Sequence, residues 1–457
     1  MNMLTLIKNG IIVNEGLSVL GSLLIEDEKI SKVILSTDFA AEAEYSSYLE
    51  SFGNCNTVDA TGMHILPGVI DDQVHFREPG NTAKATIASE SAAAVLGGVT
   101  GFMDMPNNNP PTVTNEALEG KFAIAEKESY ANYSFYLGAT NENIDEIKNV
   151  NKEKVCGVKV FMGSSTGNML VNNEETLNRI FKESPVLIAT HCEQEDVIKA
   201  NMAEYTEKYG EEIPFEMHYK IRSRQACIEC SKRALDLAVN NGSKLHILHL
   251  STADEMEMIK EAQKLNPKIS GEVCVHYMWF NCNDYAEYGS KIKCNPAIKT
   301  PEDMLAIRQA VKEGTIKVVA TDHAPHLKEE KQNNYTKAPS GIPLVQHSLQ
   351  VMLELAKKGI FTVEEVVARM SHGPAECFGV KERGFIKEGY FADLAIVNLN
   401  LPDSTSTSTP AYKCGWSPFE GQAFSSSITH TFVNGAHVVC NGKLTGEKKS
   451  HNLEFNR

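Results

Sequence analysis

The chain has no surplus of basic residues. Its 457 residues include 44 lysines and arginines against 59 aspartates and glutamates, which gives a formal net charge of −15. A nucleic-acid-binding protein needs a basic face to neutralise phosphates, and this composition favours none. We therefore expect no nucleic-acid partner.

Long apolar runs are also missing. No stretch of about 18 uncharged apolar residues occurs, and the first residues lack the apolar core of a signal peptide. We expect a cytoplasmic protein with no membrane partner.

The cysteines do not suggest a disulfide framework, because their number, eleven, is odd and the chain is long. Reduced thiols of a cytosolic protein are the simpler interpretation. Cys192 directly follows His191, a candidate site residue, and we interpret it as a buried structural thiol.

The chain has ample material for a core. Hydrophobic residues make up 42% of it and charged residues 23%, which excludes a disordered chain. Its length is typical of about three domains, or of one large barrel with a smaller module.

Both ends of the chain carry short β-like runs separated by glycines and charged residues, as hairpins require. These runs cover residues 4–13, 18–35, 56–68, 389–399 and 427–444. We predict a small β-sandwich module built from residues 1–65 and 381–457.

The middle of the chain alternates apolar, β-branched runs with amphipathic helical patterns, which is typical of a parallel sheet. The runs are GVTGFMDM, VCGVKVFM, PVLIATH, KLHILHL, EVCVHYMWF and TIKVVATD. Two helix starts are predicted. Thr300 is a capping residue followed by Pro301, and Thr362 with Glu365 forms a capping box. About 315 residues of such units predict an α/β fold, a TIM-type (β/α)8 barrel over residues 66–380.

Polar residues stand at or near the ends of these strands, and they are separated by roughly whole multiples of a βα unit of about 30 residues. They are His75, Lys159, His191, His249 and Asp322. Because the carboxyl ends of barrel strands meet at one mouth, these side chains can converge there.

Each of these residues has a simpler explanation when taken alone. A histidine at a strand end is usually packed or hydrogen-bonded, and Asp322 can equally cap the following segment. Lys159, between two valines, should not be buried unpaired: it extends to solvent, pairs with an acid, or loses its charge through modification. Together they predict a divalent-metal site, suited to zinc, with an open position for water.

Seven further motifs appear in order along the chain: HFREPG (75–80), DMPNNNPPTV (104–113), GVKVFMGSSTG (157–167), ATHCE (189–193), LHILHLST (245–252), NPAI (295–298) and ATDHAPH (320–326). With the tail motif GFIKEGYFADLAIV (384–397), the sequence resembles the amidohydrolase superfamily and, within it, the bacterial dihydroorotases. The resemblance covers nearly the whole chain.

The resemblance implies a zinc site with one or two ions per chain. Lys159 would be N6-carboxylated by carbon dioxide and bridge the metals, His191 and His249 would hold one, and His75 and Asp322 would belong to the other. Asp322 would also be catalytic, moving a proton during hydrolysis. The implied reaction is the reversible hydrolysis of L-dihydroorotate to N-carbamoyl-L-aspartate in pyrimidine biosynthesis.

The resemblance also implies a substrate-binding set. Arg77 would pair with the substrate carboxylate. The other members would be Asn107, His326, Asn295, Ser340 and Gly341. Taken alone, Arg77 fits a surface salt bridge with Glu78, and Asn107 fits a turn residue.

One residue departs from the family pattern, because Gln73-Val74-His75 stands where His-x-His is usual. We do not assign metal ligation to Gln73, since its amide oxygen is a weaker zinc ligand than imidazole. Three consequences stay open: full loading completed by Gln73 or water, one firmly held zinc with a labile second, or loss of activity.

Two other functions therefore stay open. One is a related cyclic amidohydrolase, such as a hydantoinase, dihydropyrimidinase or allantoinase. The other is a non-catalytic partner of a carbamoyltransferase. We also expect a homo-oligomer, as is common in the family. The charged segment Lys328–Lys337 is either a moving lid or, the simpler reading, a solvated loop.

Overall fold

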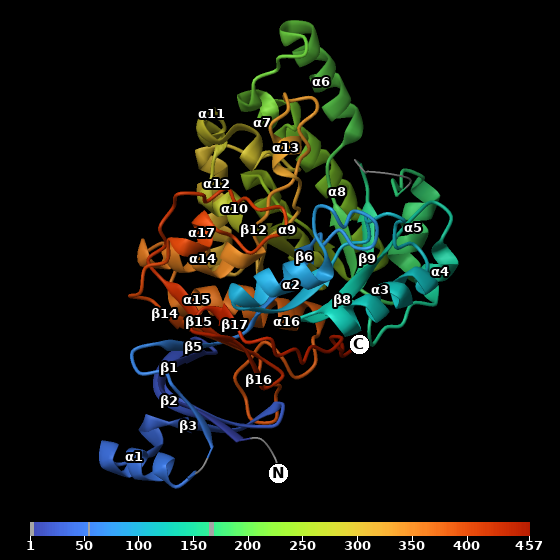
Figure 1. The fold of residues 1–457 in the computed structure, drawn as a ribbon. Coiled ribbons are helices and arrows are strands. Elements are labelled where there is room, and N and C mark those ends of the chain that lie inside the picture. The colour runs from blue at the N-terminus through green and yellow to red at the C-terminus, as the bar shows by residue number, and fades with distance from the viewer. Residues whose placement is uncertain (1–3, 54, 164–168) are drawn as a thin grey trace.

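The computed structural model describes residues 4–53, 55–163 and 169–457. Two sheets form its framework: an eight-stranded parallel sheet at the centre and a nine-stranded sheet made from both chain ends. Figure 1 shows the end sheet below the barrel, with the blue N-terminal strands β1 (Leu4–Asn14), β2 (Leu17–Glu26) and β3 (Lys29–Leu35) farthest from it.

The parallel sheet runs in chain order, with each strand beside the next. Its strands are β6 (Val69–Val74), β7 (Val99–Asp104), β8 (Asn132–Gly138), β9 (Gly157–Phe161), β10 (Ile188–His191), β11 (Leu245–Ile247), β12 (Ile269–Cys274) and β13 (Val318–Ala320). The first and last strands meet just beyond their ends, where the His75 N–H donates to the His323 carbonyl at 2.7 Å. This contact closes the sheet, and the predicted TIM-type barrel is confirmed.

Helices connect the strands around the outside. They are α2 (Ile87–Leu96), α3 (Asn115–Glu128), α4 (Ile144–Lys148), α5 (Glu174–Glu183), α6 (Glu195–Tyr209), α7 (His218–Ile221), α8 (Arg224–Asn241), α9 (Ala253–Leu265), α10 (Val275–Trp279), α11 (Tyr285–Tyr288), α12 (Pro301–Glu313), α13 (Lys328–Lys331), α14 (Ser348–Lys357), α15 (Val363–Val367) and α16 (Gly373–Phe378). Short helical turns at Phe215–Met217, Cys282–Asp284, Gly289–Ile292, Val345–His347 and Ala368–His372 complete the connections.

The predicted helix starts are confirmed. Thr300 accepts a hydrogen bond from the Asp303 N–H, with Pro301 as the first residue of α12. The Thr362 side chain accepts from the Glu365 N–H at the start of α15, so both ends satisfy otherwise unpaired donors.

Two details of the barrel differ from the sequence pattern. The run EVCVHYMWF (272–280) does not form one strand, because β12 ends at Cys274 and α10 follows directly. Strand β8 was not among the predicted runs, since Asn132, Tyr133 and Ser134 interrupt its apolar character although all its residues are buried.

The end sheet joins the two chain ends edge to edge. Its order is β17-β16-β15-β14-β5-β1-β2-β3, with β4 also paired to β1. The strands are β1 (Leu4–Asn14), β2 (Leu17–Glu26), β3 (Lys29–Leu35), β4 (Asn56–Asp59), β5 (His64–Pro67), β14 (Leu394–Asn398), β15 (Ser427–Val433), β16 (Ala436–Cys440) and β17 (Lys443–Leu444). Helices α1 (Glu42–Glu50) and α17 (Thr405–Ser408) lie in its connections.

The N-terminal and C-terminal strands of this sheet are joined by the antiparallel pairing of β5 with β14, in which Ile65 lies opposite Ile396. Both side chains are fully buried, so the two ends share one core. The expectation of a module from both ends agrees with this sheet, while the exact boundaries at 65/66 and 380/381 stay predictions.

All eleven cysteines lie in the described residues and are free thiols. Cys192 is buried, as expected. Cys227 and Cys230, three apart on α8, are both buried.

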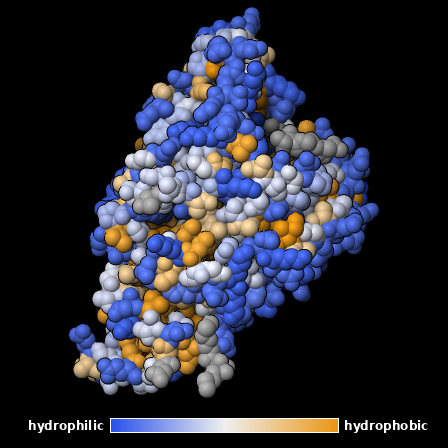
Figure 2. Space-filling model, viewed as in Figure 1, coloured by the Kyte–Doolittle hydropathy of each residue, from blue (hydrophilic) through white to orange (hydrophobic). Residues whose placement is uncertain are grey.

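Among the described residues, none of the helices has the length and apolar character of a membrane span. Hydrophilic residues cover most of the face in Figure 2, including the projecting α6.

A buried ion pair fixes the start of the HFREPG segment. The Lys121 ammonium lies 2.5 Å from Asp104 Oδ2, and both side chains are nearly inaccessible to water. The other oxygen of Asp104 accepts the Phe76 N–H at 2.7 Å. The pair therefore connects α3, β7 and the loop that carries Arg77.

Replacing Lys121 by methionine should lower the free energy of unfolding by about 3–5 kcal/mol, because Asp104 keeps a buried charge without its partner. Urea unfolding of the purified protein measures this difference. Lys232→Ala is the control, since Lys232 pairs with Asp236 on the surface and should cost less than about 1 kcal/mol. Equal effects of the two changes would contradict the role given to the buried pair.

Candidate active site

The carboxyl ends of the barrel strands surround a cavity of about 470 Å³. Every residue that the sequence analysis predicted for the site lines it: His75, Arg77, Asn107, Lys159, His191, His249, Asn295, Asp322, His326, Ser340 and Gly341. Gln73 lines it as well. Residues from different strands therefore converge as the barrel geometry requires.

One side of the cavity is built around Asp322. Its Oδ1 accepts a hydrogen bond from the Gln73 amide at 3.1 Å and lies 2.9 Å from His75 Nε2. The other ring nitrogen of His75 lies 2.7 Å from Asn107 Oδ1, so Asn107 orients this imidazole. Asn107 is thus more than a turn residue, and its contact with His75 was not foreseen from the sequence.

The other side is an imidazole pair. His191 Nδ1 lies 2.9 Å from His249 Nε2. Burial is the main cause that lowers the pKa of both rings, most strongly for His249. Both are therefore neutral at pH 7, the form that binds metal ions.

Backbone conformation at this mouth is unusual. Arg77, His249 and Asp322 have φ values of 66°, 40° and 50°, in the left-handed region that side chains other than glycine rarely adopt. Such strain concentrates at functional sites, where the surrounding structure holds it in place. Here it directs three polar side chains into one cavity.

Lys159 lies in β9 and is 1% exposed. Burial lowers the pKa of its amine to about 8, although the carboxylates of Asp322 and Glu272 oppose that shift. Its Nζ lies 4.7 Å from the centre of the Phe161 ring. Of the three outcomes considered for Lys159, extension to solvent is excluded, because the side chain is enclosed.

A second layer supports the imidazole pair. Glu193 Oε2 lies 3.1 Å from His191 Nε2 and accepts a hydrogen bond from Arg222. Burial opposes ionisation of Glu193, but Arg222 and His191 outweigh it and hold its pKa at about 2. Glu272 accepts the His249 backbone N–H at 3.1 Å. Sequence reasoning missed these residues, although Glu193 ends the motif ATHCE.

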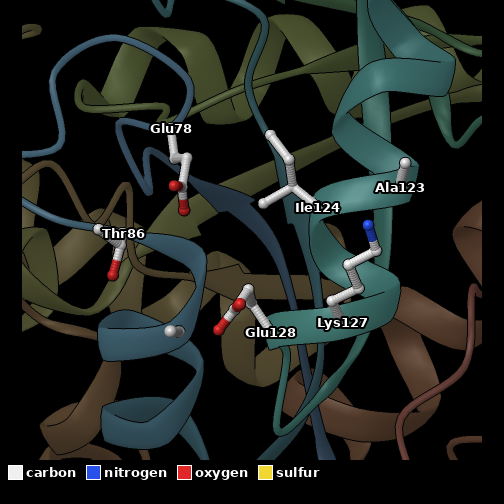
Figure 3. A pocket seen from close by; sticks show the side chains of 7 residues that line it. Glu78, Thr86, Ala123, Ile124, Lys127 and Glu128 are labelled. Atoms are coloured by element: carbon white, nitrogen blue, oxygen red, sulfur yellow. The ribbon is translucent and has the colours of Figure 1, made fainter.

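Arg77 faces the same cavity and does not pair with Glu78. Its Nε donates to the Pro325 carbonyl at 3.1 Å, and its Nη2 lies 3.2 Å from His326 Nε2. Glu78 instead accepts the Ile87 N–H at the start of α2, at 2.8 Å. Figure 3 shows the Glu78 carboxylate in a separate pocket, formed with side chains of α3.

The remaining predicted residues line the same cavity, beginning with His326 beside Arg77. His326 Nε2 lies 3.1 Å from the Ser340 carbonyl oxygen. Gly341 has a φ of 147°, and a Cβ there would lie 2.4 Å from the Ala324 carbonyl oxygen, so only glycine fits. Asn295 Oδ1 is buried with no hydrogen-bond partner among the described residues, which leaves it available to a ligand.

The segment Lys328–Lys337 is not simply a solvated loop. Lys331 is buried and donates to the carbonyls of Pro339 and Gly341, each at 2.9 Å. The buried Tyr335 hydroxyl lies 2.8 Å from His218 Nδ1. These anchors attach the segment beside the cavity rim. Residues 164–167 of the motif GVKVFMGSSTG lie outside the described residues.

The model of the amidohydrolase family matches residues 64–438. The chain belongs to this family. A dihydroorotase of Methanosarcina acetivorans is 31% identical over 87% of this chain and 84% of its own length. An allantoinase of Deinococcus radiodurans is 29% identical, covering 87% of this chain and 89% of its own.

The fold agrees with a solved structure of this amidohydrolase type. The L-hydantoinase of Arthrobacter aurescens superimposes with a TM-score of 0.89 at 25% identity, covering 99% of this chain and all of that one. Amidohydrolases are generally metal-dependent, and this chain is a cyclic amide hydrolase by its family and relatives.

If His191 binds a metal ion, as the sequence predicts, replacing Glu193 by glutamine should weaken zinc binding roughly 10- to 100-fold, because partners of a metal-binding histidine typically contribute that much. Competition with a chromophoric chelator measures the affinity. Glu195→Gln is the matched control, since Glu195 pairs with Lys199 on the surface of α6. An unchanged affinity in Glu193→Gln would show that this layer does not support the metal.

Proposed function

We propose that this chain is a zinc-dependent dihydroorotase, which hydrolyses L-dihydroorotate reversibly to N-carbamoyl-L-aspartate. The observation that carries the proposal is Arg77, a guanidinium in the same cavity as the paired histidines and Asp322. A carboxylate on the substrate ring gives that cation a partner. The dihydroorotase relative supports the same substrate.

The donors at the mouth fit zinc. Two pairs of side chains have donor atoms 2.9 Å apart. One pair is His191 with His249, and the other is His75 with Asp322. Imidazole and carboxylate are ligands that zinc prefers. In our proposal Lys159, once N6-carboxylated, would join these residues in holding one or two zinc ions. A bound zinc would supply a Lewis acid and a water that ionises near neutral pH.

Asp322 is the proposed proton carrier. It takes a proton from the attacking water as the new C–O bond forms at the ring amide carbonyl. It returns that proton to the ring nitrogen as the C–N bond breaks. The hydrogen bond from the Gln73 amide to Oδ1 fixes the orientation of the carboxylate.

The other lining residues position the ring. Arg77 binds the substrate carboxylate, with Asn107 and His326 beside it. Burial, with Arg77 and Lys84, holds the pKa of His326 well below its usual range, so its ring is neutral and can share hydrogen bonds with substrate. Asn295 and the Ser340-Gly341 backbone face the ring amide in this proposal, and the unpartnered Asn295 Oδ1 supports it.

Gln73 is a positioning residue in this proposal, and the amide contact to Asp322 supports that role. A chain that had lost catalysis would have no requirement for such an orienting contact. We also propose a homo-oligomer, on the family resemblance alone.

The first test is ring opening of dihydroorotate by the purified protein, before and after chelation and after zinc is restored. Zinc-dependent turnover is expected. If a folded, zinc-loaded protein opens hydantoin or allantoin but not dihydroorotate, the substrate is wrong. If it opens none of them, the result favours the interpretation of the chain as a non-catalytic partner of a carbamoyltransferase.

Replacing Arg77 by methionine should raise the KM for dihydroorotate roughly 10- to 100-fold, because a hydrogen bond to a charged group contributes about 1.5–3 kcal/mol. Steady-state kinetics measures the change. Dihydrouracil, which lacks the carboxylate, is the control substrate, and any slow turnover of it should be insensitive to the substitution. An unchanged KM for dihydroorotate would contradict the proposed binding of the substrate carboxylate by Arg77.

Carboxylation of Lys159 should depend on pH in the metal-free, CO₂-depleted protein. Only the neutral amine reacts with carbon dioxide, and burial places the pKa of Lys159 at about 8. The rate of reactivation at fixed dissolved CO₂ with zinc should therefore rise roughly tenfold per pH unit below 8 and level off above it. Lys159→Gln should not reactivate at any pH. A rate independent of CO₂ would contradict carboxylation.

A further inference from the structure

The hairpin of β15 and β16 carries a second group of metal-ligand side chains, outside the catalytic cavity. They are His430 on β15 and His437 and Cys440 on β16. One donor atom from each lies within 4.8 Å of the other two. None of the three lines the cavity at the barrel mouth.

A β-bulge places these side chains on one face. His437 and Cys440 are three apart, so in a regular strand they would point to opposite faces. The pairing shifts between Thr431 opposite Val439 and Phe432 opposite His437, which leaves Val438 as an extra residue. His437 and Cys440 thereby face the same way as His430, which lies directly opposite Cys440.

The two imidazoles are held with their nitrogens facing. His430 Nδ1 lies 3.0 Å from His437 Nε2, close to the 2.9 Å that separates the imidazoles of His191 and His249 at the proposed zinc site. The His437 ring stacks on Phe432, with centroids 4.3 Å apart and planes 11° apart, which restricts its orientation.

The group opens into a pocket of about 670 Å³ between the two chain ends. The pocket wall also includes Asp59 from β4 and Glu447 after β17, two carboxylates that can approach an ion bound to the hairpin. Cys440 and His437 are partly exposed, so an ion can reach them from solvent.

We propose that His430, His437 and Cys440 bind one zinc-class divalent ion, with a carboxylate or water as the fourth ligand. Two imidazoles and a thiolate are a donor set that favours zinc over magnesium or calcium. The Cys440 thiol loses its proton to solvent on binding. This site on the hairpin is separate from the catalytic cavity.

Cobalt substitution tests the proposal, because a thiolate bound to Co²⁺ gives a charge-transfer absorption that histidine, lysine and aspartate ligands do not. We expect this absorption in the wild-type protein loaded with Co²⁺ and its loss in Cys440→Ser. Cys55→Ser is the matched control, since Cys55 is a partly exposed thiol of the same module. Zinc content per chain should fall by one equivalent in Cys440→Ser and stay unchanged in Cys55→Ser.

His437→Gln provides a second variant and should also lose one zinc equivalent. The urea unfolding midpoint of each metal-free variant, compared with metal-free wild type, identifies a variant that fails to fold. The proposal is overturned if the wild-type protein shows no thiolate absorption. It is also overturned if the absorption persists in Cys440→Ser, which would assign it to another thiol such as Cys192 beside His191.

Discussion

The burial of the Lys159 amine is the constraint around which the barrel mouth is organised. Water cannot solvate this group, and burial has already lowered its pKa to about 8. The nearby acids, Asp322 and Glu272, are the main groups that favour its charged form. Carboxylation by carbon dioxide would convert the cation into an anion, which two divalent ions can then neutralise. In the proposed centre, a group that is costly as an isolated cation would thus become favourable as a metal ligand.

A cluster of buried ionisable side chains, His246, Asp72 and Glu272, lies next to this site. Glu272 accepts the His249 N–H with one oxygen, while the other lies 3.3 Å from His246 Nε2, which is also 3.2 Å from Asp72. Burial disfavours the imidazolium, but Cys377, Asp72 and Glu272 outweigh it and raise the pKa of His246 well above its usual range. The contact with His246 therefore fixes Glu272, and Glu272 fixes the backbone of His249.

Apolar runs and strand-end positions are local signals, and they predicted the barrel, the end module and a polar group at the mouth. The substrate-binding residues at the mouth were expected from the family resemblance instead. It did not predict Arg222 or the contact of Asn107 with His75, since those depend on which loops meet in space. Strand β8 was missed because buried polar residues such as Asn132 are satisfied by distant partners, here Asp393 and Asn434. The cluster on β15 and β16 was missed because a bulge changes the period on which face assignments rest.

Gln73 makes the two halves of the proposed centre unequal. On the His191–His249 side, two neutral imidazoles are present, and Glu193 and Arg222 support the first of them. On the other side, Gln73 replaces the usual imidazole, and its amide nitrogen is already committed to Asp322. An amide oxygen donates less strongly to zinc than imidazole, so in the proposed centre that side would bind zinc less strongly while keeping the orientation of Asp322. The substitution therefore affects metal retention more directly than it affects the chemistry at Asp322.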